Sequence, residues 1–562
     1  MADITPLQDQ LAKMRRDAEE RDAKRRADSY NIQYLPPSKV VISLEALGLI
    51  PEAEAKEAGV ALIAARDTKV AAISIDPKFS KSVQELEDLK KRGYQINLFV
   101  VSKSSFEYAL SFYHFVSKER EKITGKVRVE EDSEKGSQMQ KTDNLDSIPK
   151  MREVIVALND QSKVSELFEA ILSGALANRA SDIHFEPSED KVRLRYRIDG
   201  DLNDVFSDFN HQIYNSLLSR IKLLSNLKLN VKDEPQDGRF TINLTAKDVE
   251  VRVALAPSEY GEVVVMRLLD PDAINLSMQD LGLREDDLKI AQEQLDRPYG
   301  MVLNTGPTGS GKTTTLYAFL RHKNTPDLKI ITIEDPIEYH LEGIEQTQVD
   351  EEAGYTFAGG LRSLMRQDPD VILVGEIRDR ETAEISVQAA LTGHLVLSTI
   401  HANEASGAIP RLLDLGVKNV SLAPALNLLI AQRLVRRLCK YCKTESEISD
   451  ELRKNIETFV NAMPDRVDKK HYLENMKTYK VVGCEKCNMT GYKGRVGIYE
   501  LLEISKKMQD MIVQGSGQLA IEEEIKNTDF VNVQQDGVLK FISGITTLEE
   551  VEGVAGKINW KA

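Results

Sequence analysis

The clearest chemical signal in the chain is the segment GPTGSGKT (306–313), which has the spacing of a phosphate-binding loop. The apolar run GMVLNT precedes it and a segment of helical character follows it, so the loop is predicted to join a strand to a helix. In that position backbone N–H groups bind phosphate oxygens, the Lys312 ammonium reaches the β- and γ-phosphates, and the Thr313 hydroxyl coordinates Mg²⁺. The alternative is a glycine-rich turn that matches by chance. The predicted ATP-binding residues are Gly306, Pro307, Thr308, Gly309, Ser310, Gly311, Lys312, Thr313 and Thr314.

Acidic side chains follow two further predicted strands. Glu376 stands just past the apolar run VILV (371–374), where it could orient the attacking water and accept its proton. The run LKIITI ends in EDPIE (334–338), so Glu334 is expected at the same edge of an open sheet, in a Mg²⁺–water network. The alternative is that these acids are solvated loop residues.

Two histidines flank a third predicted strand, HLVLSTI. Because His394 and His401 lie near opposite ends of this strand, only one of them can easily face a bound γ-phosphate. We expect it to be His401, at the carboxyl end, where ligands bind in open α/β sheets. Against this stands the rule that isolated histidines more often have structural or surface roles.

The four cysteines of the chain form two C-x₂-C pairs, and their spacing is typical of a metal site. Each pair can form a knuckle, and two knuckles complete a tetrahedral set of four thiolates, which most often holds structural Zn²⁺. The rival interpretation is two redox dithiols, but neither pair lies in a thioredoxin-like context. The predicted zinc ligands are Cys439, Cys442, Cys484 and Cys487.

The segments that must position these residues suggest an α/β chain of several domains. Charged residues dominate 8–28, a solvated helix or mobile arm, and 127–150 is polar, acidic and poor in apolar residues, as linkers are. Strict alternation in KVRLRYRIDG (191–200) predicts a half-buried strand. The predicted organisation is a charged N-terminal arm (1–35), a small α/β docking domain (36–125), a polar linker (126–150), a second α/β domain (151–270), a hinge linker (271–278) and a nucleotide-binding domain (279–562) that includes a zinc subdomain (436–500).

Composition restricts the classes of function. The 562-residue chain is 41% hydrophobic and 29% charged, as in soluble globular proteins, and its net charge of −15 argues against general nucleic-acid binding. No run approaches the ~18–20 apolar residues that span a bilayer, and the N-terminus lacks the apolar core of a signal peptide. We therefore expect a cytoplasmic protein.

Several motifs besides the phosphate loop occur in order along the chain: SDIHFEP (181–187), PQDGRF (235–240), TIEDPIEY (332–339), LRSLMRQDPDVILVGEIRD (361–379) and ALTGHLVLSTIHAN (390–403). With the phosphate loop, they make residues 151–562 resemble the secretion ATPases of the GspE/PulE and PilB family, which power type II secretion and type IV pilus assembly. The first 150 residues resemble that family only loosely.

The resemblance implies a hexameric ring in which ATP lies between a PAS-like domain and a RecA-like ATPase domain. It makes Glu334 and its neighbours an Asp box, Glu376 an atypical Walker B glutamate, and the segment from His394 to His401 a His box. It also implies that Arg252, in EVRVAL, and Arg267, in VMRLL, sense the γ-phosphate from the PAS-like domain. The alternative for each arginine is a surface salt bridge.

The implied partners are an inner-membrane platform protein of the PilC/GspF type and other membrane-associated pilus or secretion proteins, which would bring the chain to the inner membrane without a span of its own. Retraction ATPases as a family lack the four-cysteine insertion and the extra N-terminal domain, so an assembly motor is indicated. Type IV pilus extension and type II secretion cannot be separated here. No repeated Arg-Leu-Gly motif for cyclic di-GMP occurs in 36–120.

Two other classes of function compete with this interpretation. RecA-like hexamers include nucleic-acid translocating motors, but the net charge of −15 and the lack of a basic stretch with interleaved aromatic residues argue against one. A nucleotide switch that does not hydrolyse ATP would predict a damaged Lys312 or Glu376, and both residues are intact.

Overall fold

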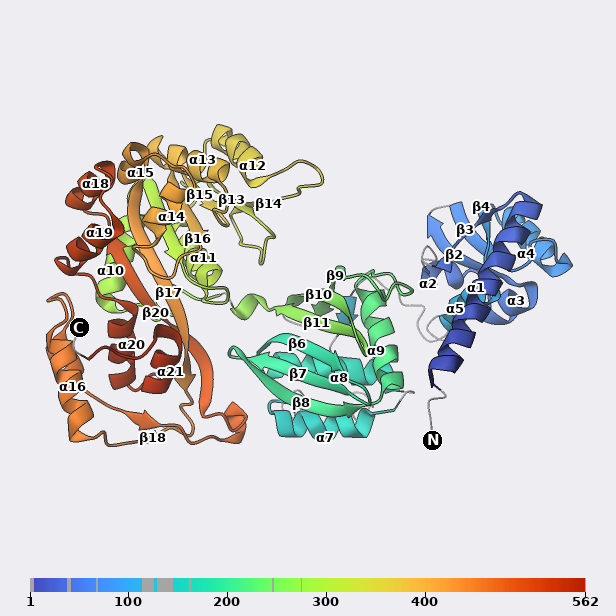
Figure 1. The fold of residues 1–562 in the computed structure, drawn as a ribbon, viewed down its shortest axis with the longest axis horizontal. Helices are drawn as coiled ribbons and strands as arrows, with labels where there is room; N and C mark the ends of the chain where they lie inside the picture. Colours follow the sequence, from blue (N-terminus) through green and yellow to red (C-terminus); the bar gives the residue numbers. More distant parts are fainter. Residues whose placement is uncertain are drawn as a thin grey trace.

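The computed structural model describes residues 5–37, 42–66, 69–113, 126–128, 145–160, 163–244, 247–273 and 275–560 (Figure 1). Three blocks, each built around its own sheet, follow one another along the described chain. The α/β class predicted from the sequence is confirmed. None of the described helices is long and apolar enough to cross a membrane.

The N-terminal block is a four-stranded sheet, in the order β1-β4-β3-β2, with helices around it. Helix α1 spans the whole segment 8–28 that is predicted to be a solvated helix or arm, but it is not wholly solvated. Its residues Ala23 and Ala27 are fully buried, and it contacts β4 and α5. The elements are α1 (Thr5–Tyr30), β1 (Gln33–Tyr34), α2 (Leu44–Leu47), α3 (Glu52–Ala58), β2 (Val60–Arg66), β3 (Lys69–Ser74), α4 (Ser80–Lys91), β4 (Gln95–Val100) and α5 (Lys103–Ser111).

The middle block contains a seven-stranded sheet in the order β5-β9-β10-β11-β6-β7-β8. The predicted alternation is observed in β7, where Val192, Leu194 and Tyr196 are buried on one face. The elements are β5 (Lys126–Arg128), α7 (Ile148–Leu158), α8 (Val164–Ala177), β6 (Ala180–Pro187), β7 (Val192–Ile198), β8 (Asp201–Phe209), α9 (His211–Leu224), β9 (Gln236–Asn243), β10 (Asp248–Ser258) and β11 (Gly261–Leu269).

The structure departs from the predicted linker (126–150) at both of its ends. Residues 126–128 form β5, which pairs in parallel with β9. An edge strand leaves backbone N–H and C=O groups unpaired, and a short extended segment can satisfy them. At the other end, α7 begins at Ile148, and Leu145 already joins the core of the middle block. Residues 129–144 lie outside the described residues.

The C-terminal block is built on a second seven-stranded sheet, in the order β14-β13-β15-β16-β12-β17-β20. All of its paired strands run parallel except β20, which is antiparallel to β17. Its sheet and covering helices are α10 (Glu285–Leu295), β12 (Gly300–Thr305), α11 (Lys312–Lys323), β13 (Ile330–Glu334), β14 (Glu345–Gln348), α12 (Phe357–Leu364), β15 (Val371–Val374), α13 (Arg380–Leu391), β16 (Leu395–Ile400), α14 (Ala408–Asp414), α15 (Asn419–Ala425), β17 (Leu426–Leu438) and β20 (Tyr492–Glu503).

The remaining elements of this block surround the cysteine loops or follow β20. They are β18 (Thr444–Glu445), α16 (Asp450–Asn461), α17 (Lys469–Glu474), β19 (Tyr479–Lys480), α18 (Lys506–Val513), α19 (Gln518–Lys526), α20 (Val533–Ile542) and α21 (Leu548–Ala555). Helices α16 and α20 share one apolar cluster, which Trp560 adjoins.

The strands of the C-terminal sheet are apolar on both faces because helices cover both. In β15, Ile372 and Val374 join one core cluster, whereas Val371 and Leu373 join the other. This explains why the strand reads as a continuous apolar run. The polar residues that follow β12, β13, β15 and β16 therefore gather at one edge of the sheet, where the strands end.

Candidate nucleotide site and cysteine cluster

The predicted phosphate loop connects β12 to α11, as its sequence context indicated. Gly306, Gly309 and Gly311 have φ angles of 145°, 78° and 88°, a region that favours glycine. A Cβ atom on Gly306 would lie 2.6 Å from the backbone oxygen of Gln432 in the neighbouring strand β17. The loop therefore needs glycine at this position for close backbone approach as well as for its turn.

The Lys312 side chain folds back over this loop. Its Nζ donates hydrogen bonds to the backbone oxygens of Gly306, at 2.8 Å, and Pro307, at 3.1 Å. Burial lowers the pKa of the Lys312 ammonium, the nearby charge of Arg433 lowers it further, and the charge of Glu376 opposes the shift. A partly desolvated cation held over a loop of backbone N–H groups suits a phosphate group.

Glu376 and His401 come together at the carboxyl edge of the sheet. The Glu376 side chain is 17% exposed, and its second oxygen lies 3.4 Å from His401 Nε2. Its first oxygen forms an ion pair with Arg378. By contrast, His394 lies at the far end of β16, where its Nδ1 is 3.0 Å from the backbone oxygen of Ala389. The structure thus brings His401, and not His394, to the predicted base.

Glu334 is buried at the end of β13 and its carboxylate is held by neutral donors. It accepts hydrogen bonds from the Tyr317 hydroxyl at 2.5 Å, the Thr332 hydroxyl at 2.6 Å and the Gln346 amide at 3.1 Å. These bonds occupy both of its oxygens within the core of the block. The arrangement fixes the strand end that leads into the EDPIE segment.

The acid that reaches the predicted Mg²⁺ ligand is Glu338, which the sequence analysis did not single out. Burial raises the pKa of the Glu338 carboxyl, whereas the charges of Arg252 and Arg267 and a hydrogen bond with Thr313 lower it. The sequence does not distinguish Glu338 as a site residue, because only the tertiary path of the loop after β13 turns its side chain toward α11.

Arg252 and Arg267 lie opposite each other on β10 and β11 of the middle block, and both charges act on Glu338 in the C-terminal block. Arg252 Nη2 donates a hydrogen bond of 2.5 Å to the backbone oxygen of Ile337. The two predicted arginines therefore face the EDPIE segment across the boundary between the blocks.

Gln432 and Arg433, near the middle of β17, also adjoin the phosphate loop and were missed. Gln432 Oε1 accepts hydrogen bonds from Asn304 Nδ2 and Thr315 Oγ1, both at 2.9 Å, and so links β12, α11 and β17. Arg433 Nη2 donates to the backbone oxygen of Asn403 at 2.6 Å. The only signal for them was a polar pair inside the apolar run LNLLIAQRLV.

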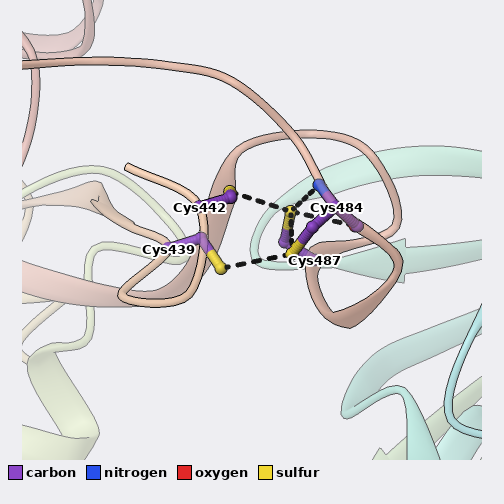
Figure 2. Close-up of side chains that lie close together, drawn as sticks. All are labelled: Cys439, Cys442, Cys484 and Cys487. Atoms are coloured by element: carbon purple, nitrogen blue, oxygen red, sulfur yellow. Dashed lines mark hydrogen bonds between the residues drawn. The ribbon is translucent and has the colours of Figure 1, made fainter. Parts of the chain in front are cut away.

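The four cysteines lie on two facing loops (Figure 2). Their sulfur atoms are all within 4.8 Å of one another, with separations of 3.9 Å for Cys439–Cys484, 3.8 Å for Cys442–Cys487 and 3.7 Å for Cys484–Cys487. Four thiolates at about 2.3 Å from a tetrahedral Zn²⁺ are about 3.8 Å apart, so the cluster fits that ion. The predicted cluster is confirmed.

Backbone donors support a thiolate at this cluster. The N–H groups of Cys484 and Gly491 donate to Cys487 Sγ at 3.1 and 3.2 Å. The cluster also adjoins the middle block, because Asn488 accepts a bond from the backbone N–H of Ile148 and donates one to Asn178. A bound ion would therefore hold a loop that the middle block contacts.

Comparisons with known proteins agree on one family. The sequence profile described as type II/IV secretion system protein matches residues 157–553. The type IV pilus assembly ATPase PilB of Myxococcus xanthus is 40% identical over 482 residues, which is 85% of this chain and 81% of that protein. The type II secretion system protein E of Aeromonas hydrophila is 44% identical over 406 residues, 72% of this chain and 78% of that protein.

A likeness to a solved structure concerns the fold alone. The X-ray structure of the ATPase DotB of Yersinia pseudotuberculosis aligns with 70% of this chain. The alignment covers 93% of the DotB chain, with a TM-score of 0.50 and 20% sequence identity.

Proposed function

Because the chain belongs to the type II/IV secretion system protein family, we propose that it hydrolyses ATP to drive type IV pilus extension. The family is one of secretion and pilus-assembly ATPases. The observation that carries the proposal is the approach of Arg252 and Arg267 to the EDPIE segment beside Thr313. It supports a nucleotide held by one domain and contacted by cations from another.

In this proposal the phosphate loop binds the triphosphate of ATP. Lys312 binds the β- and γ-phosphates, and Thr313 with Glu338 nearby would hold Mg²⁺, which supplies charge neutralisation when bound. Glu376 orients the attacking water and accepts its proton, while His401 holds the carboxylate of Glu376. The products are ADP and inorganic phosphate.

Hydrolysis would be converted into movement at the boundary between a PAS-like domain (151–270) and a RecA-like domain (279–562). Arginines that bind the γ-phosphate draw the two domains together, and loss of that phosphate lets them separate about the hinge (271–278). Six such subunits in a ring would push or rotate a partner docked at the centre. We propose that this partner is an inner-membrane platform protein, and that the N-terminal domain (36–125) docks on membrane-associated partners in the cytoplasm, where ATP is supplied.

Pilus extension is preferred over type II secretion because of the length of the matches. The alignment with the pilus assembly ATPase of Myxococcus xanthus spans 482 residues, whereas that with the type II secretion protein of Aeromonas hydrophila spans 406. The additional length favours a pilus motor. The higher identity of the shorter alignment, 44% against 40%, keeps type II secretion as the second candidate.

We propose that the four cysteines hold structural Zn²⁺. All four ligand positions are thiolates, so the site has no open position for a water molecule or substrate. The ion would stabilise the two loops between β17 and β20 without taking part in hydrolysis.

The test is ATP hydrolysis by the purified full-length chain with Mg²⁺ present. We expect phosphate release from the wild type and none from Lys312→Ala, which should also lose tight nucleotide binding. The control is Lys289→Ala, an exposed lysine on α10, which should retain activity. Absence of hydrolysis by a folded, zinc-loaded, hexameric wild type would refute the proposal.

To separate pilus extension from secretion, a deletion strain should lose surface pili while export of folded proteins continues.

A further inference from the structure

The loop that carries His401 is held at two points by side chains from the antiparallel strands β17 and β20. The loop runs from the end of β16 to the start of α14. Its Asn403 backbone oxygen accepts a hydrogen bond from Arg433 Nη2 at 2.6 Å. Its Ala405 backbone N–H donates to Glu500 Oε2 at 3.0 Å.

Arg433 and Glu500 lie on the same face of the antiparallel pair β17–β20. Glu500 is paired with Ala431 in the antiparallel register, and Arg433 is two residues further along β17. Arg433 and Glu500 are therefore diagonal neighbours across two strands. Their opposite charges act on each other, since the charge of Glu500 opposes the lowering of the Arg433 pKa that burial causes.

Glu500 is a buried acid for which the proposed hydrolysis has no direct use. Its residue is 7% exposed, and burial raises the pKa of its carboxyl, while hydrogen bonds from the backbone N–H groups of Ala405 and Val533 oppose that rise. The second of these bonds, from Val533 at the start of α20, is 3.2 Å long. A buried carboxylate costs free energy unless it is paired. The two backbone bonds pair this one, and they connect the loop of His401 to the start of α20.

Arg433 also adjoins the phosphate loop. A Cβ atom on Gly306 would lie 3.2 Å from Arg433 Nη1, and the charge of Arg433 lowers the pKa of Lys312. One guanidinium thus contacts the loop of His401 with one nitrogen and approaches the phosphate loop with the other. Arginine can make both contacts because its planar guanidinium carries several donor nitrogens, whereas lysine has a single ammonium nitrogen.

We propose that Arg433 and Glu500 are positioning residues for hydrolysis, which together clamp residues 401–405 so that His401 stays against Glu376. This inference rests on the proposed ATPase function. It deepens that function by assigning a positioning role, exerted through His401, to two strands that follow the core motifs in sequence.

The test compares Arg433→Gln and Glu500→Gln with a matched control, Arg437→Gln, in the full-length chain. Arg437 lies on the same strand and its side chain is exposed. We expect Arg433→Gln to lower kcat about ten-fold or more, as loss of a hydrogen bond to a charged group does, with little change in KM. Adding Arg433→Gln to His401→Ala should cause no loss beyond that of His401→Ala alone, because both changes act through the same loop.

A second readout does not depend on turnover. Hydrogen exchange of the backbone amides in 400–408 should be faster in Arg433→Gln and Glu500→Gln than in the wild type and in Arg437→Gln, with equal melting temperatures. Unchanged exchange in this segment would overturn the clamp even if the wild type proved inactive. In an active enzyme, a multiplicative loss of kcat in the Arg433→Gln/His401→Ala double variant would overturn the action through His401.

Discussion

Arg267 Nε donates a hydrogen bond of 2.9 Å to Asp182 Oδ1, directly across the paired strands β11 and β6. Asp182 is almost fully buried, with a side-chain exposure of 6%, whereas the Arg267 side chain is 62% exposed. The bond uses one of the three guanidinium nitrogens, on a side chain that stays largely exposed. Asp182, from the SDIHFEP motif, orients a cation that we propose to bind the γ-phosphate.

Replacement of Asp182 should weaken ATP hydrolysis through Arg267. We expect Arg267→Ala to lower kcat/KM about 10³-fold, the scale of an arginine that stabilises a transferring phosphoryl group. Asp182→Asn should cost about ten-fold, because it removes the negative charge that strengthens the bond from Arg267 and that also pairs with Arg197. The double variant should be no slower than Arg267→Ala alone in steady-state assays. Losses that multiply would show that Asp182 acts independently of Arg267.

Replacement of Glu376 should separate nucleotide binding from turnover. Glu376→Gln keeps the shape of the side chain but removes the proton acceptor, so we expect unchanged ATP affinity and a kcat lowered about 10²–10⁴-fold. Fluorescent-nucleotide titration and phosphate release measure the two effects. Glu384→Gln, on the exposed face of α13, is the matched control and should be as active as the wild type. Equal rates for Glu376→Gln and wild type would contradict its assignment as the base.

Replacement of Glu338 should alter the requirement for Mg²⁺. Its carboxyl is hydrogen-bonded to Thr313 and lies near Arg252 and Arg267, so neutralisation removes negative charge from the proposed cation position. We expect Glu338→Gln to raise the Mg²⁺ concentration for half-maximal hydrolysis at least several-fold, with little effect on nucleotide binding in EDTA. The exposed acid Glu342 provides the control variant. A Mg²⁺ dependence identical to that of the wild type would exclude Glu338 from the cation site.

Replacement of Cys442 should remove the metal and loosen the C-terminal block. We expect Cys442→Ser to lose zinc by elemental analysis and to melt at a lower temperature, because binding of the metal contributes to folding. Ser446→Ala, in the same loop region, should retain both zinc and stability. Properly folded wild-type protein that was never exposed to a chelator and yet contains no zinc would refute the metal assignment.

Local sequence was sufficient to predict the sites whose residues lie within short segments of the chain. The strand, loop and helix around Lys312 were predictable because the glycines and the flanking patterns lie within one short segment. The cysteine cluster was equally predictable, because each C-x₂-C pair forms its own knuckle and the chain has no other cysteines. The family resemblance followed from motifs that are themselves short and ordered.

Other features could not be predicted locally. The sequence predicts a linker at 126–128, because a three-residue strand has no periodicity. Only pairing with the edge of β9 makes this segment a strand. The sequence pattern favours Glu334 over Glu338, because Glu334 directly ends the apolar run. The path of the loop after β13 decided that one is enclosed by Tyr317, Thr332 and Gln346 and the other meets Thr313.

By itself, then, the sequence determined that this chain has a phosphate loop, a four-thiolate cluster and α/β segments of a recognisable motor family. Only the tertiary structure decided which side chains surround those features. A mainly parallel sheet brings strand ends that are far apart in the chain to one edge, so Glu376 meets His401 and Arg433 meets Asn403. Sequence periodicity specifies which face of a strand is buried, but not which distant strand lies beside it.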